Sequence, residues 1–144
     1  MTTPASEASV EAQNFNWLVA RFVQETAGVV AAIAVSSDGL LVAMSASLER
    51  ANADRLAAIG SAVLSLAHGV SECYPMGEPD KVVIELTQGY LLVCTIGEGC
   101  ALGVLASKQA RLGTVAFEMA LFANRAGAVL TPSLIEELKV TVGS

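Results

Sequence analysis

The chain has 144 residues and a mass of 14.8 kDa, the usual size of one domain with a single hydrophobic core. Charged residues make up 15% of it and apolar residues 53%, which is more apolar surface than a small monomer easily hides, so we expect a partner surface. Fourteen acidic residues stand against eight basic ones that are scattered singly, and this argues against binding to nucleic acid or to an anionic membrane surface.

The sequence predicts neither membrane insertion nor secretion. The longest uninterrupted apolar run, Val29 to Val35, is far shorter than the roughly 20 residues of a spanning helix. Residues 1–11 lack the basic and then apolar pattern of a signal peptide. The three cysteines form no Cys-x-x-Cys pair, which is typical of reduced thiols. We therefore expect a cytoplasmic protein.

The chain divides into a flexible N-terminal tail at residues 1–13, one domain at residues 14–139 and a C-terminal tail at residues 140–144. The tail assignment rests on low hydrophobicity without a periodic face. From Asn14 onward, apolar residues recur at helical spacing and predict a first helix that ends near Gly28. These residues are Phe15, Leu18, Val19, Phe22 and Val23.

A β-hairpin is predicted next. The apolar, branched run at residues 29–35 is typical of a strand, and residues 40–44 form a second one. Asp38-Gly39 between them supplies the positive φ angles of a tight turn, so the two strands should be antiparallel neighbours.

A second helix is predicted from about Asn52, as its capping residue, to about Cys73. Its large apolar residues are spaced three, four, three and four, and we expect this stripe to lie on the sheet. The stripe consists of Leu56, Ile59, Val63, Leu66 and Val70.

Three more strands are predicted at residues 81–87, 90–96 and 101–106, with connections too short for parallel pairing. A helix over residues 108–126 follows, and Thr131-Pro132 then begins a short helix that ends at Lys139. The order α-β-β-α-β-β-β-α indicates an α+β domain in which helices cover one five-stranded antiparallel sheet.

The residues needed for catalysis are scarce. His68 is the only histidine, so a thiol enzyme would need a pocket that joins it to a cysteine. No cluster has zinc-ligand spacing and no glycine-rich segment matches a phosphate-binding loop. We predict that the chain is not an enzyme and that it holds no cofactor and no metal.

Two features predict a twofold dimer. One face of the second helix carries small residues, and Gly60 in a helix interior costs about 1 kcal/mol relative to alanine unless a second helix approaches closely. The strand at residues 81–87 should be an apolar sheet edge that a second copy could pair. The predicted interface is Ala57, Gly60, Ser61, Leu64, Ser65, His68, Val82, Val83, Ile84 and Leu86.

Several stretches resemble the Roadblock (dynein light-chain Roadblock) family, in particular its bacterial branch associated with Ras-like small GTPases. The resemblance extends from about Asn14 to Leu134. The matching stretches are Asn16-Trp17-Leu18, Val35-Ser36-Ser37-Asp38-Gly39-Leu40-Leu41, Ala53-Asp54-Arg55-Leu56-Ala57-Ala58-Ile59, Ser65-Leu66-Ala67, Phe117-Glu118-Met119-Ala120-Leu121 and Leu130-Thr131-Pro132.

This resemblance implies a cytoplasmic homodimer of the profilin-like Roadblock fold that regulates or scaffolds a Ras-like GTPase, in an operon that also encodes a sensor-kinase-like protein. Whether such a dimer accelerates hydrolysis, promotes exchange or only tethers the GTPase stays open. Arg50 and Asp54, at one end of the second helix, are our candidates for GTPase contact. The alternative function is a small-molecule sensor, which an apolar cavity with a few inward polar groups would favour.

Overall fold

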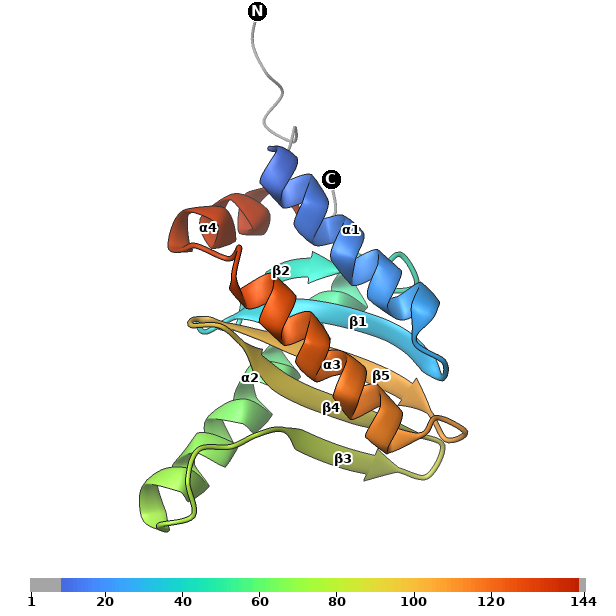
Figure 1. Ribbon diagram of the computed structural model, residues 1–144, viewed down its shortest axis with the longest axis vertical. Coiled ribbons are helices and arrows are strands. Elements are labelled where there is room, and N and C mark those ends of the chain that lie inside the picture. The colour runs from blue at the N-terminus through green and yellow to red at the C-terminus, as the bar shows by residue number, and fades with distance from the viewer. Residues whose placement is uncertain (1–8, 143–144) are drawn as a thin grey trace, which may run out of the picture.

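The computed structural model describes residues 9–142. Four helices and five strands follow one another in the predicted order (Figure 1). Their bounds are α1 Val10–Glu25, β1 Val29–Ser36, β2 Leu41–Met44, α2 Arg50–Cys73, β3 Val82–Leu86, β4 Gly89–Ile96, β5 Cys100–Ser107, α3 Leu112–Gly127 and α4 Pro132–Thr141.

The five strands form one sheet in the order β2-β1-β5-β4-β3, and every neighbouring pair is antiparallel. The β1–β2 hairpin turns at Asp38-Gly39, as the sequence predicted. Of these two residues only Gly39, at +83°, has a positive φ, so the expectation of positive angles at both is wrong for Asp38. The β4–β5 turn lies beside it, because the Ser37 N–H donates a 3.0 Å hydrogen bond to the Gly99 carbonyl. The predicted single antiparallel sheet is confirmed.

Helices α1 and α3 cover one face of the sheet and enclose the larger hydrophobic core (Figure 1). Phe122 of α3 makes edge-to-face contacts with two α1 residues, with ring centroids 6.2 Å from Phe15 and 5.6 Å from Phe22. Helix α4 packs against both α1 and β2 and adds Leu134, Ile135 and Leu138 to this core.

Helix α2 is the helix on the opposite face, and it covers that face incompletely. It crosses the strands and its C-terminal half extends past the sheet (Figure 1). Its buried residues all lie in the N-terminal half, and all of them except Gly60 belong to the second, smaller core. They are Ala53, Leu56, Ala57 and Gly60.

The two edges of the sheet differ in how they are protected. The short strand β2 lies against α4, whereas β3 is hydrogen-bonded to β4 alone and has an open backbone edge within residues 9–142. An open apolar edge strand pairs readily with another chain. The structure therefore confirms that β3 is an edge and shows that it is the unprotected one.

Several predicted boundaries need correction. Helix α1 begins at Val10, because the Ser9 hydroxyl accepts a hydrogen bond from the Ala12 N–H, so residues 10–13 belong to the helix rather than to a tail. Residues 140 and 141 likewise belong to α4. Helix α2 starts at Arg50 without a side-chain cap, so Asn52 is not its capping residue. The parts of the predicted tails at residues 1–8 and 143–144 lie outside the described residues.

Candidate partner surface on helix α2 and strand β3

Large apolar side chains on α2 are exposed. Ile59 is 51% exposed, Leu66 73% and Val70 56%, and Val63 between them is half-buried. We call these four residues the α2 stripe. The prediction that the five-residue apolar stripe lies on the sheet holds for Leu56, which is buried, and in part for Val63, which packs against the second core. It is wrong for Ile59, Leu66 and Val70. Alanines and a glycine face the sheet instead, so the stripe lies along one flank of the helix.

The small residues of α2 that we predicted at a dimer interface therefore do not all face away from the sheet. Ala57 is fully buried against the sheet, which corrects our expectation that it faces a second helix. An added Cβ at Gly60 would meet nothing within 4 Å, so packing within this chain does not require a glycine there. Ser61, Leu64, Ser65 and His68 line a cavity of about 290 Å³ between α2 and the strand ends.

The predicted residues of β3 lie at the open edge. Val82, Ile84 and Leu86 pair with Val93, Leu91 and Gly89 and share the sheet face that carries α2. Val82 and Ile84 are half-buried, and Leu86 is 54% exposed. Val83 points to the opposite face, where it is 42% exposed. The backbone edge and these apolar side chains together form the surface that a paired strand would cover.

The α2 stripe and β3 belong to one apolar region. Val63 packs on the same core as Val82, Ile84 and Leu105, which are only partly buried. No Lys, Arg, Asp or Glu occurs between Arg55 and Glu72 on the helix. A long, uncharged, half-covered helix beside an open strand edge is typical of a surface that a second protein covers. The absence of charged residues from positions 56–71 is the feature of the sequence that could have predicted this exposed apolar surface on α2.

Within residues 9–142, α2 is also the one helix long and apolar enough to cross a membrane by length and composition. The sequence prediction against membrane insertion considered only continuous apolar runs and missed this helix. The N-terminal half of α2 nevertheless packs on the sheet as part of the second core. The apolar composition of the helix is therefore accounted for in part by this packing.

Arg50 and Asp54, the candidate GTPase contacts, lie together at the start of α2. Arg50 Nε is 3.1 Å from Asp54 Oδ1, and both side chains are about half exposed. Arg50 Nη1 also donates a 2.7 Å hydrogen bond to the Val142 carbonyl at the end of α4. Arg50 thus joins two helices, whereas Asp54 is bonded only to its neighbour on α2.

The structure places His68 and Cys100 in the lining of the same cavity, which is the arrangement a thiol enzyme would require. Burial, however, raises the pKa of the Cys100 thiol to about 11, so it is protonated at neutral pH. His68 Nδ1 is 3.5 Å from Glu78 Oε2, an ion pair that forms only when the histidine is protonated. These groups offer no activated nucleophile.

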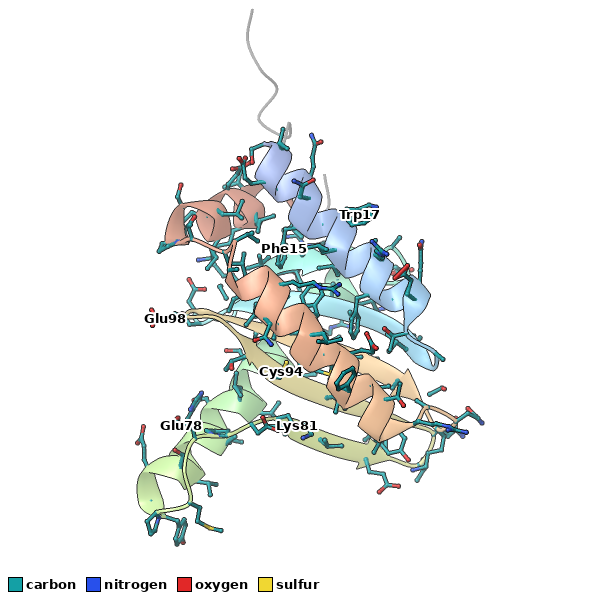
Figure 2. The ribbon with its side chains drawn as sticks, viewed as in Figure 1. Phe15, Trp17, Glu78, Lys81, Cys94 and Glu98 are labelled. Atoms are coloured by element: carbon teal, nitrogen blue, oxygen red, sulfur yellow. The ribbon has the colours of Figure 1, made fainter. Side chains whose placement is uncertain are left out.

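Cys94 lies on the other side of the sheet, in the core under α3 (Figure 2), and burial raises its pKa to about 11 as well. Cys73 is exposed at the end of α2. Among residues 9–142, no group of three or more His, Cys, Asp or Glu side chains is placed to hold a metal ion.

These features define an α+β domain with helices on both faces of its sheet, one protected edge, one open edge and an exposed apolar helix next to it. The family model for the Roadblock/LC7 domain matches residues 15–106. The chain belongs to the Roadblock/LC7 family, and its fold is the Roadblock fold that the sequence resemblance implied. No curated protein sequence matches it significantly.

Solved structures agree with this assignment. A Roadblock/LC7 domain from Streptomyces avermitilis is 32% identical, with a TM-score of 0.73 over 76% of this chain and 92% of that one. MglB from Myxococcus xanthus is 16% identical, with a TM-score of 0.74 over 81% and 94% of the two chains. The gliding protein MglB from Thermus thermophilus is 14% identical, with a TM-score of 0.75 over 90% and 97%. The MglB likenesses show a shared fold.

Proposed function

We propose that this chain is a cytoplasmic homodimer that regulates or scaffolds a Ras-like small GTPase and is not itself an enzyme. Membership of the Roadblock/LC7 family supports the regulatory role. The observation that carries the proposal is the α2 stripe beside the open edge of β3, because one twofold contact would cover both.

In the proposed dimer, β3 pairs with β3 of the second copy and the two sheets become continuous. The C-terminal half of α2 extends past its own sheet, so it would lie over the second copy (Figure 1). The exposed Leu66 and Val70 would be buried there, together with the sheet face that carries Leu86. Ser61, Leu64, Ser65 and His68, which we predicted at the interface, would lie on the other flank of α2.

The GTPase contacts of this dimer are proposed at the N-terminal end of α2. Asp54 is the stronger candidate for a GTPase contact, because the Arg50 side chain is already hydrogen-bonded to the end of α4. A charge reversal at Asp54 should weaken the complex and leave the fold unchanged. A sensor-kinase-like protein of the same operon is proposed as a second partner.

The test is a pull-down with purified Ras-like small GTPases of the source organism, each loaded in turn with GDP and with GTP. We expect capture by the wild-type dimer and weaker capture by Asp54→Lys. Glu25→Lys, an equally exposed charge reversal at the end of α1, is the matched control and should bind normally. Absence of capture in both nucleotide states would overturn the proposal. GTP hydrolysis by the purified chain alone would overturn the assignment as a non-enzyme.

A further inference from the structure

The cavity beside α2 has features that the proposed dimer does not use. It lies where α2 passes the C-terminal ends of β1 and β4 and the start of β5. Its volume of about 290 Å³ is at the lower end of the range of about 300–1,000 Å³ that small-molecule sites occupy. Small helix residues, Ser61 and Ser65, create the space, because larger side chains there would fill it.

Polar groups without partners line this cavity. The hydroxyls of Ser61, which is half-buried, and of Ser65 and Thr95, which are exposed, form no hydrogen bond within residues 9–142. They come from two separate elements, α2 and β4, and each hydroxyl can both donate and accept. Leu64 and Cys100 add apolar surface to the same wall. The site thus combines an apolar surface with several free hydrogen-bonding groups, as ligand pockets do.

The electrostatics of the lining favour an uncharged ligand. Among residues 9–142, no Lys, Arg, Asp or Glu side chain lines the cavity, and His68 is its one basic side chain. The Cys100 thiol is neutral because burial raises its pKa. The charged residues that lie next to lining residues in the sequence are acidic: Asp38 follows the β1 end and Glu98 lies in the β4–β5 turn (Figure 2). An anion would lose its hydration without gaining a free cationic partner, because a protonated His68 is already paired with the Glu78 carboxylate at 3.5 Å.

The cavity and the α2 stripe lie on different flanks of the helix. Ser61 and Val63 are two residues apart, which places them about 200° apart around the helix axis, and the same holds for Leu66 and His68. A dimer formed through the stripe would therefore leave the cavity accessible. A molecule in the cavity would contact both α2 and the ends of the strands.

From the volume, the free hydroxyls and the missing charges, we infer that this cavity is a binding site for a small uncharged molecule that carries amide or hydroxyl groups. Binding would hold the middle of α2 against the sheet and so fix the helix that carries the α2 stripe. This inference stands apart from the GTPase proposal, since it depends only on the described chain.

Matched pairs of neutral and anionic probes test the charge selectivity. Nicotinamide and nicotinate have nearly the same shape and differ in charge, and so do benzamide and benzoate. The readout is the ¹H–¹⁵N spectrum of the wild-type protein during titration with each probe at millimolar concentration. We expect the neutral probes to shift backbone signals of residues 61–68 and 95–101, and the anions to leave them unchanged. Equal shifts with both members of each pair, or no shifts with either neutral probe, would overturn the inference.

Substitutions inside and outside the cavity lining test whether the probes bind in the cavity. Ser65→Leu should fill the cavity and abolish the shifts, whereas Ala58→Leu, at an exposed position on the same helix outside the lining, should retain them. The isosteric Thr95→Val should weaken binding about 3- to 10-fold through loss of one hydrogen bond. Unchanged binding to a folded Ser65→Leu variant would place the probe elsewhere and contradict the inference.

Discussion

The guanidinium of Arg50, on the first turn of α2, donates a hydrogen bond of 2.7 Å to the carbonyl oxygen of Val142, the residue after α4. The contact joins residues 92 positions apart and satisfies a carbonyl that the end of α4 leaves without a helical partner. Through it, the helix on one face of the sheet is linked to the helix that protects the β2 edge.

Replacing Arg50 with methionine should lower the free energy of unfolding by about 1 kcal/mol, a reduced value because the side chain is half exposed. Asp54→Asn, which weakens only the surface ion pair, is the matched control and should change stability by less. Urea unfolding of the three proteins measures this difference. Equal stability of Arg50→Met and the wild type would show that the hydrogen bond contributes nothing net.

The α2 stripe predicts how the proposed dimer can be broken. Leu66→Glu places a charge where the dimer would bury an apolar side chain, so the dissociation constant should rise roughly 100-fold or more. Ala58→Glu adds the same charge to an exposed position outside the stripe and should leave the dimer intact. Sedimentation velocity at micromolar concentration distinguishes the two results. A wild-type chain that sediments as a monomer would refute the dimer itself.

Thiol reactivity should follow burial. Cys94 and Cys100 are buried, and both pKa values are raised to about 11, so their thiolate fractions at neutral pH are very small. Iodoacetamide should therefore modify only the exposed Cys73 in the native protein and all three cysteines after denaturation. Mass spectrometry of the labelled chain reads out the sites. Rapid native labelling of Cys100 would show that the cavity opens more widely than the structure indicates.

Acid should loosen α4. Hydrogen bonds from Ser9 lower the pKa of Glu137, and those from Ser36 and then Lys139 lower the pKa of Asp38. Because the folded pKa values lie below the ordinary values of 4.5 and 3.8, this stabilisation is present at neutral pH and is lost as the pH falls through the folded values. Asp38 is exposed and Glu137 is half-buried, so high salt should weaken the effect, most of all at Asp38.

Hydrogen exchange of α4 amides, compared between neutral pH and about pH 3, measures this loosening, with α3 as the internal reference. Exchange is corrected for its intrinsic pH dependence. We expect the protection of α4 to fall more than that of α3. Glu137→Gln should reduce the difference between the two helices, because it removes one of the titrating groups. Parallel loss of protection in both helices would contradict a local effect.

The element order, the antiparallel sheet and the position of β3 at an edge all follow from the amino-acid sequence. These depend on local chemistry: Asp38-Gly39 requires a tight turn, and the short connections around β4 permit only antiparallel neighbours. The Roadblock/LC7 family could also be recognised from the sequence, because stretches such as Ala53 to Ile59 each lie within one secondary-structure element.

The side of α2 that meets the sheet is evident only from the folded chain. Helical spacing shows that Ile59, Leu66 and Val70 share a face, but it does not say what covers that face. Ala53 and Ala57 are fully buried against the sheet, and the larger residues stay on the flank. The sequence also could not predict the hydrogen bond from Arg50 to Val142, because it joins segments that are distant in the chain. Nor could it predict the cavity at Ser61 and Ser65, because that cavity depends on the path of α2 across the strands.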